Sequence, residues 1–208
     1  MSKRFFKMAS IAAPVAAICF FADCSDNAGG EKTADNNSKA AIENIMTRTS
    51  VRSYKDQPVE KDIIETMLKA GMAAPSAVNK QPWHFYVVTD KTKRLALAET
   101  SPNAKMVANA PLAIVVCGDM NLALEGDARS FWVQDCSAAS ENILLAAHAL
   151  GLGGVWTGTY PSQERCDAVR KVLDLPSNLI PLNTIVIGYP DCDNKPKDKW
   201  DPAKVTYL

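Results

Sequence analysis

Two arginines and two hydroxyl residues lie within one short segment and could together bind a phosphate group. Arg48 and Arg52 flank Thr49 and Ser50. A guanidinium is a planar fork that holds a phosphate through two parallel hydrogen bonds, and hydroxyl groups supply further donors. Taken alone, the pattern is more often a solvated loop between two helices, so it needs support from other parts of the chain.

A second, turn-rich segment carries two side-chain amides. Asn79 and Gln81 can each donate and accept hydrogen bonds, which suits the polar edge of a flat heteroaromatic ring. Pro75, Ser76 and Ala77 precede them and would keep the approach to such a ring narrow. The two segments together therefore indicate a ligand with a phosphate and a flat ring.

Two further segments lie in the C-terminal half. Residues 151–158 (GLGGVWTG) follow a long apolar stretch, and their glycines let the backbone approach another group closely. The same glycines also fit a helix C-cap followed by a tight strand entry. In the tail, Lys195, Lys197 and Lys199 alternate, so an extended arm would project them from one side, unless they form a solvated charge run.

In this order, the segments resemble the FMN-dependent nitroreductase family over nearly all of residues 40–208. The quoted matches are RTSVRSY, APSAVNKQPWHF, LLAAHALGLGGVWTG, IGYP and KPKDK. The resemblance implies an α+β fold that is nitroreductase-like, with a central mixed β-sheet flanked by helices, a long buried helix and an extended C-terminal arm. No G-x-G-x-x-G motif follows an expected strand, so a Rossmann dinucleotide site has no support.

The resemblance also implies which residues surround a non-covalently bound FMN. The phosphate and the pyrimidine side would be held by Arg48, Thr49, Ser50 and Arg52. The ring would be lined by Pro75, Ser76, Ala77, Asn79 and Gln81, with this loop reaching across from the other subunit of a homodimer. Backbone near the flavin N5 would come from Trp156, Thr157 and Gly158. The phosphate would also meet Lys197 and Lys199, at positions where the family often has arginine.

The implied activity is a two-step hydride exchange. A small-molecule donor, NADH or NADPH in the family, gives up its electrons and leaves before a nitroaromatic, quinone or similar acceptor takes them. We assign no side chain as a catalytic acid, base or nucleophile, because the cofactor supplies the chemistry. Arg52 is the candidate for stabilising the anionic reduced flavin. The alternatives are an exported flavin-binding protein without turnover and an interaction lipoprotein that has lost the cofactor.

The composition argues against other classes of function. Lysine plus arginine and aspartate plus glutamate both number 23, so the net charge is zero, which does not favour a nucleic-acid partner. The two histidines and six cysteines show no metal-ligand spacing, so we expect no metal site. Cys117 ends an apolar run and is expected to be buried, whereas export would permit one disulfide among the other cysteines.

The first residues predict export. A basic start precedes an apolar stretch at residues 8–22 that is short for a membrane span, which is the layout of a secretory signal peptide; a buried N-terminal helix is the alternative. Cys24 lies where a lipoprotein signal is cleaved and acylated, although Asp23 stands where such signals carry a small uncharged residue. Lipidation of Cys24 would attach the protein to a membrane; simple secretion and an uncleaved anchor are the alternatives.

These features predict three parts of the chain: a signal peptide at 1–24, a polar tether at 25–39 and the FMN-binding domain at 40–208. The expected location is the cell envelope or periplasm, or the cytoplasm if the signal is not used. Export would separate the protein from NADH and NADPH, so an exported form would need another reductant.

Apolar periodicity predicts alternating helices and strands within the domain. We expect helices from about residue 40 and at 58–71, 91–100, 131–150 and 162–173, and strands at 84–89, 112–117, 155–159 and 184–188. Residues 174–181 are expected to form a loop. Trp83 and His84, beside the first strand, are expected to be structural rather than to face a cofactor.

Overall fold

The computed structural model describes residues 28–208, with side chains from residue 36 onward. The chain divides into two units between residues 37 and 38, and all four strands belong to the second unit, residues 38–208. The predicted signal peptide and Cys24 lie outside the described residues. Among the described helices, none is long and apolar enough to cross a bilayer.

Helix α1 (Ala28–Thr47) differs from the sequence-based expectation. Most of the polar segment expected to form an unfolded tether is helical here, because the helix begins at Ala28 and not near Ala40. The expectation rested on the lack of apolar surface for packing, but helical hydrogen bonds are internal and can extend from an established turn without a packed face. The proposed division into tether and domain stays a prediction.

The sheet has the strand order β1-β2-β4-β3, with β1 at Trp83–Val88, β2 at Leu112–Asp119, β3 at Gly153–Gly158 and β4 at Leu179–Gly188. The α+β class is confirmed, but the expected mixed sheet is not, since every pairing of these strands is antiparallel. β2 and β3 do run in the same direction. β4 lies between them with the opposite direction, so no two parallel strands are neighbours.

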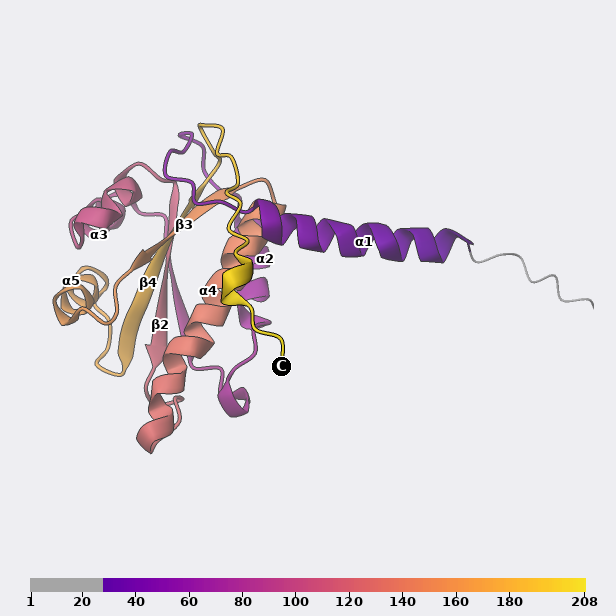
Figure 1. Ribbon diagram of the computed structural model, residues 1–208. Helices are drawn as coiled ribbons and strands as arrows, with labels where there is room; N and C mark the ends of the chain where they lie inside the picture. Colours follow the sequence, from indigo (N-terminus) through magenta and orange to yellow (C-terminus); the bar gives the residue numbers. More distant parts are fainter. Residues whose placement is uncertain (1–27) are drawn as a thin grey trace, which may run out of the picture. The chain divides into compact units, whose positions relative to one another are not determined.

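Helices cover both faces of this sheet (Figure 1). α2 (Lys61–Met72) and the long α4 (Phe131–Ala149) pack on one face, and α3 (Lys91–Ala98) and α5 (Gln163–Leu173) lie on the other. Strand β2 serves both layers, because Ile114 and Val116 belong to the first core and Ala113, Val115 and Cys117 to the second. This alternation is the period of two that a strand buried on both faces requires.

Most helices and strands begin and end close to the residues expected from the sequence. Ser162 caps α5 as expected, its hydroxyl accepting a hydrogen bond from the Arg165 N–H at 3.4 Å. β4 starts five residues earlier than expected, at Leu179 instead of Thr184. The expected loop extended to Pro181, but this residue lies in β4 at the register shift opposite Cys117, where a strand tolerates a proline.

Burial agrees with most of the expectations for single residues. Trp83 and Cys117 are buried, and burial raises the pKa of the Cys117 thiol to about 12. His84 is exposed on β1, with its ring centroid 5.1 Å from that of Tyr86, so it is not a core residue. The four cysteines in the described part of the chain are free thiols.

Candidate functional site

The arginine segment, residues 48–52, is attached to the edge strand β3. Ser50 forms a parallel bridge with Gly154, and the Val51 N–H donates to the Gly154 carbonyl oxygen at 3.1 Å. A Cβ atom on Gly153 would lie 2.6 Å from the Val51 Cβ. Glycine is therefore required at position 153 for this close approach. From the sequence, we expect the glycines to let the backbone approach another group, and that group is the arginine segment.

The C-terminal tail is attached to the other side of the same segment. The Lys55 N–H donates to the Tyr189 carbonyl oxygen at 2.9 Å, and the Asp191 N–H donates to the Ser53 carbonyl oxygen at 3.2 Å. These backbone contacts hold the start of the tail beside the arginine segment. Residues near position 54 thereby come together with residues near position 190, although they lie far apart in the sequence.

Tyr54 anchors the arginine segment to strand β4. Its hydroxyl lies 2.5 Å from the Val51 carbonyl oxygen and 3.1 Å from that of Val186, so the phenol contacts both the arginine segment and strand β4. The side chain is buried, and burial raises the pKa of the phenol well above its usual range. Tyr54 is therefore a neutral structural anchor at physiological pH.

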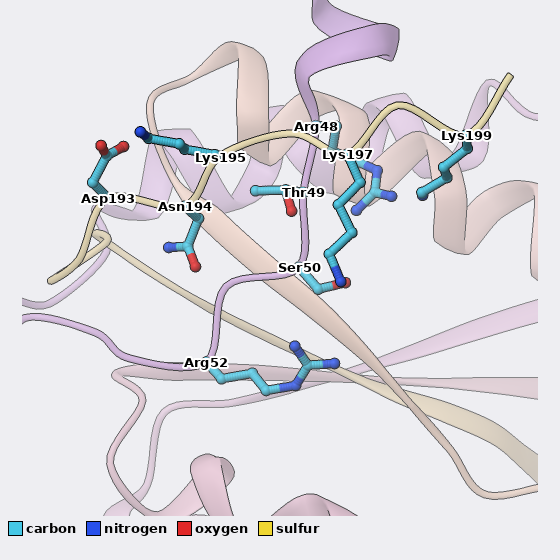
Figure 2. A pocket seen from close by; sticks show the side chains of 9 residues that line it. All are labelled: Arg48, Thr49, Ser50, Arg52, Asp193, Asn194, Lys195, Lys197 and Lys199. Carbon is cyan, nitrogen blue, oxygen red and sulfur yellow. The ribbon is translucent and has the colours of Figure 1, made fainter.

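Arginine segment and tail enclose a pocket of about 430 Å³, which we call the cation pocket (Figure 2). The tail passes over the arginine segment, so the pocket has side chains from both. It is lined by Arg48, Thr49, Ser50, Arg52, Asp193, Asn194, Lys195, Lys197 and Lys199. The lining thus comprises five cationic side chains, one carboxylate, two hydroxyls and an amide. This combination suits a multiply charged anion such as a phosphate.

The cations of the pocket differ in how far they are already neutralised. The Arg48 Nε lies 3.3 Å from Glu141 Oε1 on α4, which orients the guanidinium and offsets part of its charge. Among the ion pairs of the described side chains, none involves Arg52 or Lys197. These two charges are therefore available to a ligand.

A second pocket, of about 440 Å³, runs along the open edge of β3 and is called the edge pocket. It is lined by Arg52, Pro102, Asn103, Met106, Val155, Trp156, Thr157 and Gly158. Arg52 lines both pockets, so they are adjacent. The Thr157 hydroxyl donates to the Thr184 carbonyl oxygen at 2.8 Å and is not available to a ligand. An edge strand leaves backbone groups without a strand partner on its outer side, and these can bind a ligand.

Three residues of the edge pocket lie outside every segment singled out in the sequence. Pro102, Asn103 and Met106 belong to the short helix η2 (Pro102–Ala108), which begins after the capping residue Ser101. The Ser-Pro-Asn sequence is a recognisable helix start. Nothing in the sequence shows that this helix lines the same pocket as β3, because that arrangement depends on the folding of the sheet. Asn103 adds an exposed amide to the pocket.

The amide loop, residues 75–81, lines neither pocket within this chain. Its polar groups bond to each other: the Gln81 N–H donates to Ser76 Oγ at 2.9 Å, and Gln81 Nε2 donates to Asn79 Oδ1 at 2.9 Å. Val78, Asn79 and Gln81 have positive φ angles of 51°, 54° and 50°. The expectation that this loop serves the site of another subunit stays a prediction.

The predicted site residues thus form two groups. The structure brings together Arg48, Thr49, Ser50, Arg52, Trp156, Thr157, Gly158, Lys197 and Lys199. It leaves apart Pro75, Ser76, Ala77, Asn79 and Gln81. Lys195, Asp193 and Asn194 join the first group, as neighbours of the expected lysines in the tail.

Comparison with known proteins finds relatives within one family. The model of the nitroreductase family matches residues 45–103 and 98–189. A relative from Methanothermobacter thermautotrophicus, whose name proposes an NADH dehydrogenase/NAD(P)H nitroreductase, is 44% identical over 79% of this chain and 84% of its own length. The FMN reductase [NAD(P)H] of Bacillus subtilis is 28% identical over 72% of this chain and 65% of its own.

Solved structures extend the similarity to the fold. A structure from Bacteroides thetaiotaomicron, whose name also proposes an NADH dehydrogenase/NAD(P)H nitroreductase, has a TM-score of 0.76 and 47% identity over 81% of this chain and 96% of that one. The FMN-dependent nitroreductase of Clostridium difficile has a TM-score of 0.73 and 33% identity over 80% of this chain and 98% of that one. This chain belongs to the nitroreductase family.

Proposed function

We propose that this protein is an FMN-dependent oxidoreductase that takes electrons from NADH or NADPH and passes them to nitroaromatic, quinone or similar acceptors. The observation that carries the proposal is the pair of adjacent pockets that share Arg52. FMN has a phosphate at one end of a flexible chain and a flat ring at the other. A cationic pocket can bind the phosphate, and the open strand edge beside it can bind the ring.

The chain's own residues then have distinct tasks. Lys197, Arg48 and the hydroxyl of Ser50 hold the phosphate in the cation pocket. Asn103 and the backbone of 156–158 meet the polar edge of the ring in the edge pocket. Arg52, between the pockets, places a positive charge where it stabilises negative charge on the reduced ring. FMN, when bound, supplies the hydride-transfer chemistry.

Buried thiols do not take part in this reaction. Burial raises the pKa of the Cys136 thiol, and the nearby Asp135 and Cys117 raise it further. Neither Cys136 nor Cys117 lines the two pockets, and both stay protonated at physiological pH. The site therefore works by binding, orientation and charge, without a side-chain nucleophile.

An absorption spectrum of the purified full-length protein tests the proposal. Flavin bands, release of free FMN on heating and bleaching of the bands by NADH or NADPH are the expected results. A colourless protein that does not take up added FMN would refute the proposed function. Flavin bands that no nicotinamide donor bleaches would refute the donor while keeping the cofactor.

A homodimer is the second part of the proposal. Ile42, Ile45 and Met46, near the C-terminal end of α1, are 61%, 53% and 68% exposed and form one helical face. A groove of about 310 Å³ continues from this face past Glu141 to Trp200 and borders the cation pocket. An apolar surface next to a ligand site supports association with a second copy. The exposed amide loop of that copy would then complete the ring side of the site.

Light scattering on the purified protein tests this assembly. A mass of two chains is expected, and replacing Ile45 with Glu should lower both the dimer fraction and FMN affinity. A monomer that binds FMN as tightly as the wild-type protein would refute the shared site.

Export and lipid attachment through Cys24 are also proposals, supported by the basic start and the short apolar stretch of the sequence. Expression of the full-length chain in a bacterium, followed by fractionation and mass spectrometry of the N-terminus, tests them. An unprocessed N-terminus in the cytoplasm would refute both.

A further inference from the structure

Asp135 is a buried carboxylate outside both pockets. It lies on α4 with only 7% of its surface exposed, and its Oδ1 accepts a hydrogen bond from the Ala77 N–H at 2.8 Å. Among the ion pairs of the described residues, none involves Asp135. Burying a carboxylate without a nearby cation destabilises the fold, so packing alone does not account for Asp135 at this position.

The group that Asp135 holds is the amide loop. Val78, Asn79 and Gln81 adopt left-handed backbone conformations, which are unfavourable for residues other than glycine and most of all for the β-branched Val78. The Val78 side chain is 80% exposed, so its packing within this chain does not hold the conformation. Backbone strain of this kind persists only where other contacts fix it, and it is concentrated at functional sites.

The other hydrogen bonds of Asn79, Lys80 and Gln81 are local. They end on Ser76, Ala77 or Asn79, that is, within the loop. The bond from Ala77 to Asp135 instead joins the loop to α4, which belongs to the core. A charge-assisted bond to a backbone N–H is among the stronger hydrogen bonds, so it can set the position of the whole loop relative to the core.

We propose that Asp135 is a positioning residue for the flavin site. Its carboxylate holds Ala77, and through it the strained loop that carries Asn79 and Gln81, in the conformation that meets the ring bound by the second copy of the homodimer. This inference rests on the proposed function. It adds a residue that touches no ligand and acts through the loop.

The test compares three variants of the full-length protein with the wild-type protein. Asp135→Ala removes the acceptor, and Asp135→Asn keeps an oxygen at the same place. Ser140→Ala is the matched control: Ser140 is also buried on α4, where it accepts from Asn183 Nδ2 at 2.8 Å, but it does not contact the loop. The measurements are the FMN dissociation constant, the visible circular dichroism of the bound flavin and the thermal midpoint without FMN.

The expected result is a dissociation constant raised about tenfold or more by Asp135→Ala, with an altered flavin dichroism, since a hydrogen bond to a charged group is lost. Asp135→Asn should stay within about threefold of the wild-type protein. Ser140→Ala should lower the thermal midpoint and leave the dissociation constant and dichroism unchanged.

Wild-type values for Asp135→Ala, or an equal loss of affinity in Ser140→Ala, would overturn the inference and leave Asp135 a residue that only stabilises the fold. If Asp135→Ala does not fold, Ala77→Pro decides by the same criteria, because it removes the donor, and the extended conformation of Ser76 permits a following proline. Failure of the wild-type protein to bind FMN would refute the proposed function before any variant is measured.

Discussion

Replacing Gly153 with Ala should separate the arginine segment from β3. The new Cβ would lie 2.6, 2.6 and 2.7 Å from the Cβ, Cγ2 and Cγ1 atoms of Val51, whereas ordinary contact begins at 3.4 Å. Rotation of the side chain cannot relieve this clash, because the Val51 Cβ is fixed by the backbone. The two chains must therefore move apart by about 0.8 Å, the difference between 2.6 and 3.4 Å.

This movement should lower the free energy of unfolding. Overpacking of a filled site costs about 1–3 kcal/mol. The same shift lengthens the 3.1 Å bond from the Val51 N–H to the Gly154 carbonyl oxygen, and losing it would add about 1 kcal/mol. Gly153→Ala should thus lower the free energy of unfolding by about 2–4 kcal/mol. It should also weaken FMN binding about tenfold, because Arg52 moves with the segment.

Urea unfolding and fluorescence titration with FMN measure the two effects. Gly158→Ala is the stability control, since a Cβ at Gly158 would have no atom within 4 Å. Adding Val51→Ala to Gly153→Ala removes two of the three close contacts and should restore part of the stability. Equal unfolding free energies for Gly153→Ala and the wild-type protein would refute the argument that this glycine sets the position of the arginine segment.

Three other substitutions give separate tests. Arg52→Ala should weaken FMN binding about tenfold or more in a fluorescence titration and lower the flavin reduction potential, with Arg52→Lys intermediate because the charge is kept and the fork is lost; unchanged values for both would contradict its assigned role. The raised pKa of Tyr54 means that only its neutral form is stable in the fold, so its contribution is complete below pH about 10 and is lost as the pH rises further. Tyr54→Phe should therefore reduce the loss of stability above pH 10 in urea unfolding, and an identical pH dependence would contradict this. Cys192→Ser should remove one fast-reacting thiol in titration with a thiol reagent, because Cys192 is exposed while the other three described cysteines are buried; an unchanged number of fast thiols would contradict it.

Local chemistry explains which parts of the structure could be predicted. The capping residue Ser162 and the apolar residues of α4 act within one element, so their sequence pattern is sufficient. The arginine segment and the tail lysines could be assigned to one anion site through the family resemblance. Their meeting in the cation pocket depends on backbone contacts of Ser53 and Lys55 with the tail, which have no signature in the sequence.

Longer-range arrangements account for what could not be predicted. Asn103 lines the edge pocket only because the fold brings η2 and β3 to the same pocket. The antiparallel pairing arises because β4, the last strand in the sequence, inserts between β2 and β3. Asp135 could not be identified from the sequence, since its role depends on its contact with Ala77 in a distant loop.

Comparing FMN with riboflavin tests the central claim most directly, because the two ligands share the ring and differ only in the phosphate. Both dissociation constants would be measured on the purified full-length protein after removal of bound flavin. If the cation pocket holds the phosphate, FMN should bind at least about 100-fold more tightly than riboflavin, and Lys197→Ala should narrow the gap. Equal affinities for the two ligands would contradict the assignment of this pocket.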